Sequence, residues 1–151
     1  MAENAEVVIN QGAVLKIKTG QPTAFDQTTW QTYMTDATEV GQVHNMGDYG
    51  GTRDIQTHDT ISDGKRKKRG GVKDAGDLSV EFGKAISDAG QAAVIAAFES
   101  GETVSVSIVD DLVEEYFVGI ISDITKSRGD ANTIITQSGT VALSEYFEFA
   151  V

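Results

Sequence analysis

Residues 59–82 read DTISDGKRKKRGGVKDAGDLSVEF, and the rest of the chain is organised around this stretch. Half of the chain's 12 basic residues lie here within nine positions, although the protein also has 23 acidic residues. Strand-like sequence precedes the basic run around Ile55 and Ile61 and follows it at Leu78, Val80 and Phe82. We therefore predict a long basic loop over residues 62–76, between two strands, that contacts another copy of the protein. The basic residues of this predicted contact are Lys65, Arg66, Lys67, Lys68, Arg69 and Lys73.

Length and composition indicate one globular domain over residues 1–151. A chain of this length can bury roughly 70% of its unfolded surface in one core. Hydrophobic residues make up 40% of the chain, and its 16 glycines with a single proline predict many turns. The absence of cysteine excludes disulfides, thiolate metal sites and a cysteine nucleophile.

The net charge of -11 opposes binding to polyanions, because the surplus acids repel phosphates. No apolar run approaches the ~18 residues of a membrane helix, and the first ten residues lack the basic and apolar segments of a signal peptide. We expect a soluble protein that is made in the cytoplasm and has no membrane contact. Residues 1–12 are interpreted as an N-terminal arm that orders only on docking.

Alternating apolar and polar residues predict most of the strands. The alternation is clearest in AVLKIKT (13–19), DLSVEF (77–82) and TVSVSIV (103–109), and it returns in EYFVGIISDI (115–124), so that the last two segments form a hairpin. We also expect extended structure in TTWQTYMT (28–35), and a hairpin of residues 39–44 with residues 52–62. Two more strands are expected around residues 133–137 and 139–147, joined at Gln137, Ser138 and Gly139.

One segment, SDAGQAAVIAAFESG (87–101), has the period of a helix. Ser87 or Asp88 can cap its first amides, Asp88 and Gln91 have capping-box spacing, and Gly101 follows its last turn. Val94, Ile95 and Phe98 are expected on its packing face. The predicted fold class is therefore mainly β: a β-sandwich or barrel of roughly eight strands with one flanking α-helix at about residues 88–100.

Signals for catalysis are weak. No nucleotide-binding, zinc-protease or serine-hydrolase motif is present. His44 and His58 could ligate a metal if strands brought them together, although hydrogen-bonded or solvated histidines are the simpler interpretation. Asp110, Asp111, Glu114 and Glu115 could supply paired carboxylates, but acids that flank a hairpin turn are normally solvated. We expect no enzymatic activity and no cofactor.

The basic run has three interpretations: a solvated loop, a nucleic-acid or nuclear-localisation patch, or a contact with another copy. No aromatic residue interleaves with KRKKR, so the run itself offers no base stacking. Five like charges repel one another and extend the segment away from its own domain. In an acidic protein, the nearest complementary surface is another copy of itself, which favours self-association.

The order of these segments resembles the tail tube proteins of long, flexible-tailed bacteriophages. The resemblance covers roughly residues 25–147 and is carried by TTW, VGQV, GGTRDIQTHDT, the basic loop, GVKDAGDLSVEF, DAGQAAVIAAFESG and TVSVSI in succession. It implies a β-sandwich with a flanking helix, assembled as hexameric rings that stack into the tube through which double-stranded DNA leaves. The type VI secretion tube protein is a related alternative, and a monomeric acidic module that binds nucleic acid or an acidic protein through its basic loop is another.

The same resemblance implies further expectations. The basic loop would reach a neighbouring ring and would be disordered before assembly. The partners would be other copies, a tape-measure protein, a tail-tip initiator and a tail terminator, and the location would be the virion. Acids that face the lumen would keep DNA from adhering. Asp110, Asp111, Glu114 and Glu115 are our candidates for the acidic lumen or the ring interface.

Overall fold

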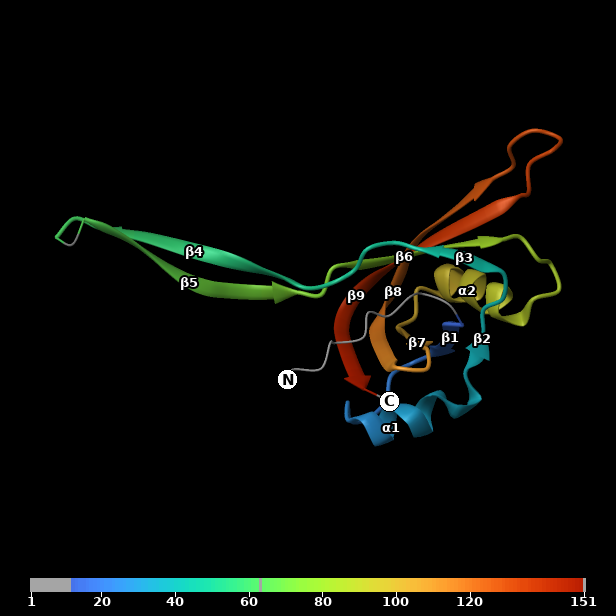
Figure 1. Ribbon diagram of the computed structural model, residues 1–151, viewed down its shortest axis with the longest axis horizontal. Coiled ribbons are helices and arrows are strands. Elements are labelled where there is room, and N and C mark those ends of the chain that lie inside the picture. Colours follow the sequence, from blue (N-terminus) through green and yellow to red (C-terminus); the bar gives the residue numbers. More distant parts are fainter. Residues whose placement is uncertain (1–11, 63, 151) are drawn as a thin grey trace, which may run out of the picture.

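The computed structural model describes residues 12–62 and 64–150 and consists of a rounded body from which one long hairpin projects (Figure 1). The predicted N-terminal arm, apart from Gly12, lies outside the described residues. In the part of the chain that is described, no helix has the length and apolar character needed to cross a membrane. The mainly β class predicted from the sequence is confirmed.

The body is a curled antiparallel sheet of seven strands, in the spatial order β2, β1, β7, β8, β9, β6, β3. Its strands are β1 (Val14–Thr19), β2 (Thr38–Glu39), β3 (Val43–Met46), β6 (Asp77–Gly83), β7 (Val104–Val109), β8 (Val113–Ser127) and β9 (Thr136–Ala150). Because the two longest strands, β8 and β9, pair along almost their whole length, they connect the β1–β7 half of the sheet to the β6–β3 half.

The projecting hairpin is a separate two-stranded sheet of β4 (Thr52–Thr60) and β5 (Lys65–Asp74). The predicted loop over residues 62–76 is therefore wrong in its conformation: the basic residues lie on a strand, and the turn is confined to the few residues between β4 and β5. Each basic residue from Lys65 to Arg69 has a cross-strand partner on β4. A strand tolerates five consecutive basic residues because successive side chains point to opposite faces, which keeps neighbouring charges apart.

Helix α2 (Ala89–Ser100) covers the inner face of the curled sheet and confirms the predicted helix. The Asp88 carboxylate accepts a hydrogen bond from the Gln91 backbone amide at 2.8 Å, and Gly101 ends the helix at φ 71°. The reciprocal half of the capping box does not form, since the Gln91 side chain is buried and bonds other backbone groups. A side chain at Gly90 would overlap the Glu39 carbonyl, so glycine allows the helix to approach this segment closely.

The predicted packing face of α2 is confirmed at Val94, which packs against the core, and is wrong at Phe98. Gly90, Gln91 and Ala97 are its buried residues, whereas Phe98 is 37% exposed. The helix contacts the core through Ala93, Val94 and Ala97, and the small alanines let it lie close to the sheet. The core beneath it contains apolar side chains from five strands: Leu15, Ile17, Leu78, Val80, Phe82, Val104, Val106, Ile108, Phe117, Ile121, Val141 and Leu143.

The segment TTWQTYMT is helical rather than extended, so that prediction is wrong. It forms α1 (Gln27–Tyr33) followed by the 3-10 turn η1 (Met34–Asp36). Asp26 caps α1 by accepting hydrogen bonds from the Thr29 hydroxyl at 2.6 Å and amide at 3.2 Å, which lower the pKa of Asp26. Trp30 and Met34, one helical turn apart, are buried on the outer face of the sheet against Tyr116 and Val118. Tertiary burial of these two residues outweighs the extended propensity of the threonines.

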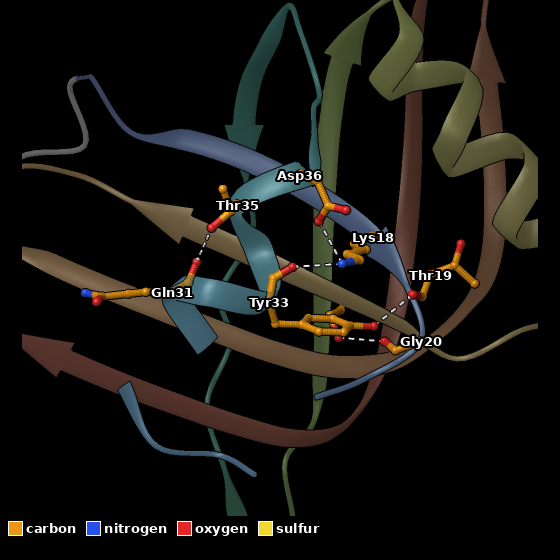
Figure 2. Close-up of polar contacts among 8 residues, drawn as sticks. Lys18, Thr19, Gly20, Gln31, Tyr33, Thr35 and Asp36 are labelled. Carbon is orange, nitrogen blue, oxygen red and sulfur yellow. Dashed lines mark hydrogen bonds and ion pairs between the residues drawn. The ribbon is translucent and has the colours of Figure 1, made fainter. Parts of the chain in front are cut away.

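A polar clamp holds α1 and η1 against the end of β1 (Figure 2). The Lys18 ammonium donates to the Tyr33 carbonyl at 2.9 Å and to the Asp36 carboxylate at 2.7 Å, and it lies 4.0 Å from the centre of the Tyr33 ring. The hydrogen bond from Lys18 lowers the pKa of Asp36. The Tyr33 hydroxyl donates to the Thr19 carbonyl at 3.0 Å. The half of the outer face over β7 and the start of β8 is thus covered.

Two predicted strand arrangements are also wrong. Residues 39–44 and 52–62 do not pair, because β3 pairs with β6 and β4 pairs with β5. The two strands expected after residue 132 are one continuous strand, β9. The turn-like triplet at Gln137, Ser138 and Gly139 runs straight between β6 and β8, and buried Gly139 lies opposite Val80 and Ile124.

Candidate assembly surfaces

The hairpin concentrates positive charge on an otherwise acidic protein. Residues 52–74 contain seven basic and four acidic residues, a net charge of +3, which leaves five basic and 19 acidic residues, a net charge of -14, for the remainder of the chain. Every residue of the hairpin from Lys65 to Gly70 is exposed. The hairpin therefore carries the sign of charge that would attract the body of another copy.

The two faces of the hairpin differ in chemistry because of its register. Lys65, Lys67 and Arg69 share one face with His58, which lies opposite Lys67. On the other face, the Arg66 guanidinium pairs with the Asp59 carboxylate at 3.0 Å. Apolar side chains are also exposed along the hairpin, namely Ile55 at 54%, Ile61 at 101% and Val72 at 77%. Lone two-stranded hairpins are marginally stable in water, so a surface of this kind gains from a partner.

The four predicted acidic site residues lie around the turn between β7 and β8 but do not form one surface. Asp110 is used locally, since its carboxylate accepts hydrogen bonds from the Leu112 and Val113 amides, both at 2.8 Å. Asp111 is exposed. Glu114 and Glu115, as neighbours on β8, point to opposite faces of the sheet.

Glu114 is a buried carboxylate that holds α1. It is 9% exposed and accepts hydrogen bonds from Gln27 at 3.1 Å, from Gln31 at 3.0 and 3.1 Å, and from the Tyr116 hydroxyl at 3.2 Å. Burial and the nearby Glu114 charge raise the pKa of Tyr116. Glu115 accepts hydrogen bonds from the Tyr49 and Tyr146 hydroxyls on the other face. Both carboxylates are thus engaged within the chain, and their assigned role at a lumen or ring interface stays a prediction.

A second group of acids lies on what we call the open face: the outer face of the sheet over β6, β9 and the distal part of β8, where α1 does not reach. Asp77, Ser79 and Glu81 alternate there with buried Leu78, Val80 and Phe82. Across the strands, Thr140 pairs with both Ser79 and Asp123. Glu145 lies on the same side, opposite Val118. The open-face acids are Asp77, Glu81, Asp123 and Glu145.

The composition of the open face disfavours binding to polyanions, because its charged strand residues are acidic. Its acids are interspersed with Ser79, Thr140, other small side chains and one exposed apolar residue, Ile120, which lies opposite Ala142. No lysine or arginine occupies the strand positions between the acids. His44, on the neighbouring strand β3, bonds the Glu81 carboxylate at 2.8 Å. None of these four acids belongs to the site predicted from the sequence, although the alternation of Ser79 and Glu81 with apolar residues indicates a polar outer face on this strand.

The two histidines are not brought together. His44 lies on β3 in the body, whereas His58 lies on β4 in the projecting hairpin. Among residues 12–62 and 64–150, no group of three or more His, Asp or Glu side chains is arranged to hold a metal ion. The metal site considered for His44 and His58 therefore gains no support from the geometry.

The sequence matches no protein-family profile and none of the curated proteins. Solved structures do resemble it. The tail tube of SPP1 superposes with a TM-score of 0.68 at 12% identity, over 96% of this chain and 80% of that chain. A chain from the sheath/tube terminator of PVC, an extracellular contractile injection system, gives a TM-score of 0.68 at 11% identity, over 97% of this chain and 99% of that chain.

A type six secretion system protein also resembles the chain, with a TM-score of 0.54 at 14% identity, over 89% of this chain and 82% of that chain. At such identities the likeness concerns the fold. It spans the sheet, both helices and the hairpin, since more than nine tenths of this chain aligns with the SPP1 protein. The resemblance predicted from the sequence is thereby confirmed at this level: the chain has the fold of tail tube proteins.

Proposed function

We propose that this chain is a structural subunit that polymerises as stacked hexameric rings into a phage tail tube, and that it catalyses no reaction. The observation that carries the proposal is the combination of the tail tube fold with a basic hairpin that projects from an acidic body. Copies of one chain with these two surfaces attract one another, and the partner surface is present on every copy.

In this assembly the hairpin reaches from one copy to the body of another. Its exposed apolar residues and its basic face would be covered there, with the carboxylates of the second copy as counter-charges. The edges of the sheet support the same proposal. Strands β2 and β3, which form them, are short and leave backbone groups unpaired, and pairing between copies would satisfy these groups.

We assign the lining of the tube to the open face. Its four acids would repel the phosphates of double-stranded DNA during ejection, so the DNA would pass without binding. Asp110 and Asp111, on the turn between β7 and β8, remain candidates for a ring interface.

The wider setting follows from the family resemblance. A tape-measure protein, a tail-tip initiator and a tail terminator would be the other partners, and the chain would be made in the host cytoplasm and reside in the virion. A tube of the type VI secretion kind is the related alternative, which the likeness to a type six secretion protein keeps open.

Electron microscopy of the purified chain at rising concentration tests the proposal. We expect rings or tubes from the parent chain. Replacement of Lys65, Arg66, Lys67, Lys68 and Arg69 by serine should leave a folded monomer that forms no tubes, because the hairpin then lacks its attraction for the acidic body. Substitution of the distant pair Lys126 and Arg128 by serine is the matched control and should leave assembly intact.

Two results would count against this function. Normal tubes from the five-serine variant would exclude the basic run as the contact. A parent chain that stays monomeric at high concentration and binds DNA in a salt-sensitive way would favour the monomeric binding module instead.

A further inference from the structure

The hairpin joins the body through two short connections that are rich in glycine. Residues 47–51, GDYGG, lead into β4, and Ala75 with Gly76 leads from β5 to β6. Glycine restricts the backbone less than any other residue, so the chain itself does not fix the direction of the hairpin. That direction depends on the contacts that hold these two connections to the body.

Tyr49 anchors the first connection. Its hydroxyl lies 2.7 Å from both carboxylate oxygens of Glu115 on β8. Its half-buried ring meets Phe117 edge-on, with centroids 5.2 Å apart, and lies 5.8 Å from the ring of Tyr146 on β9. Burial, together with the hydrogen bond to Glu115, raises the pKa of Tyr49, which keeps the hydroxyl protonated as a donor.

Glu115 is itself held in place from β9. The Tyr146 hydroxyl lies 2.8 Å from Glu115 and 2.9 Å from Glu148, which is the cross-strand neighbour of Glu115. Two tyrosines from different parts of the chain therefore meet one carboxylate. A side chain fixed in this way is a firm point of attachment for a flexible connection.

The second connection is tied to the same region. The Gly76 carbonyl accepts a hydrogen bond from the Leu143 amide on β9 at 2.9 Å, and the Gly76 amide donates to the Asp74 carboxylate at 2.9 Å. A β-carbon at Gly76 would lie 2.7 Å from the Gly50 carbonyl oxygen, so the two connections touch each other. Gly76 has φ 81°, a conformation that glycine adopts freely.

We infer that Tyr49, by its contact with Glu115, sets the direction of the hairpin before any second copy binds, and so acts as a positioning residue for assembly. The hairpin then has a fixed direction relative to the body in the free subunit, in contrast to the mobile loop expected from the family resemblance. The part concerning assembly rests on the proposed function, whereas the fixed direction does not. A hairpin already in its docking direction loses less conformational freedom on binding, which strengthens association.

Pulsed electron–electron double resonance, which measures the distance between two spin labels, tests the direction of the hairpin in the dilute monomer. The chain contains no cysteine, so Thr57→Cys on the exposed hairpin and Ala92→Cys on the exposed side of α2 accept one spin label each. We expect one narrow distance distribution. Tyr49→Ala should lose the narrow peak, and Tyr49→Phe, which keeps the ring contacts but not the hydrogen bond, should broaden it partially.

Tyr33→Phe is the matched control, because it removes a phenol hydrogen bond on α1, remote from the hairpin connections, and should leave the distribution unchanged. A broad distribution in the parent, or the same narrow one in Tyr49→Ala, overturns the inference. Circular dichroism of each variant shows whether a broad distribution reflects a loose hairpin or loss of the fold. If Tyr49→Ala does not fold, Tyr49→Phe still tests the inference.

Assembly provides the second readout. The lowest concentration at which tubes sediment should rise several-fold for Tyr49→Phe and stay unchanged for Tyr33→Phe. If Tyr49→Phe broadens the distance distribution but tubes still sediment at the parent concentration, Tyr49 does not contribute to assembly. If the parent forms no tubes, the proposed function fails, and the spin-label distances still decide whether the hairpin is held.

Discussion

At the scale of single residues, a few buried polar side chains hold segments that the sheet alone would not fix. Gln91 is the clearest case, since it is 1% exposed and all its polar atoms are used. Its amide nitrogen donates to the Gly41 carbonyl at 2.9 Å and to the Gly83 carbonyl at 2.8 Å, while its oxygen accepts from the Ala85 amide at 2.9 Å. One side chain thus joins α2 to two loops beside β6.

Gln91→Ala should lower the free energy of unfolding by about 2–4 kcal/mol, because it leaves three backbone groups without partners in a buried place. Urea denaturation measures this. The exposed Gln56→Ala on the hairpin is the control and should change stability by no more than about 0.5 kcal/mol. Equal stability of the two variants would mean that water satisfies the abandoned backbone groups.

The tyrosines around the β8 acids make stability depend on alkaline pH. Burial raises the pKa of Tyr49, Tyr116 and Tyr146 above the ordinary value near 10, and the nearby glutamates add to this. In the unfolded chain they ionise near pH 10, so the folded state binds more protons above that pH. Their contribution is complete below about pH 10 and is lost as the pH rises from there.

The urea midpoint should therefore be level from pH 8 to pH 9.5 and fall steeply above about pH 10. Tyr49→Phe should reduce the steepness of the fall, because one of the three groups no longer titrates. The same slope in parent and variant would show that Tyr49 does not contribute to it.

At the scale of elements, α1 shows that a very short helix is stable when it buries one large side chain against a sheet. Helix α1 has only seven residues, yet its Trp30 is fully buried and stacks on Tyr116 with centroids 5.0 Å apart. The sequence contained the signal, since Asp26 precedes apolar residues at Trp30, Tyr33 and Met34. The threonines concealed it.

Capping should be measurable at α2, where the sequence left Ser87 and Asp88 as alternatives. The Asp88 carboxylate accepts hydrogen bonds from the Gln91 amide and from the Gly41 amide at 3.1 Å. Asp88→Ala should destabilise the protein by about 1–2 kcal/mol, whereas Ser87→Ala should change stability by no more than about 0.5 kcal/mol. Thermal unfolding of the two variants compares them, and a larger effect of Ser87→Ala would assign the cap to Ser87.

At the scale of the whole molecule, the charges separate by surface. The basic residues gather on the hairpin, while the open face carries only acids among its ionisable strand residues apart from neighbouring His44. A basic hairpin that projects from a body of net charge -14 favours contact with the body of another copy.

If the open face lines a tube, inversion of its charge should change the affinity for DNA and not the assembly. Asp77→Lys combined with Glu81→Lys and Asp123→Lys should give tubes that retain double-stranded DNA in co-sedimentation at low salt, while parent tubes release it. Lysine at Glu99 and Glu102, which are exposed at the end of α2 and just after it, is the control. Equal DNA retention by both variants would place the open face outside the conduit.

The local patterns of the sequence determined the mainly β class, helix α2 with its ends, several of the strands and the resemblance to tail tube proteins. In the strands, local periodicity agrees with the final burial, and in α2 the cap residues Asp88 and Gly101 lie at the expected ends. Only the tertiary structure decided the partners: that β3 pairs with β6, that the basic run is a strand paired with β4, and that Gly139 continues a strand instead of ending one. The positions of Tyr49 and of the open-face acids likewise depend on chain segments far apart in sequence, whose approach no local pattern encodes.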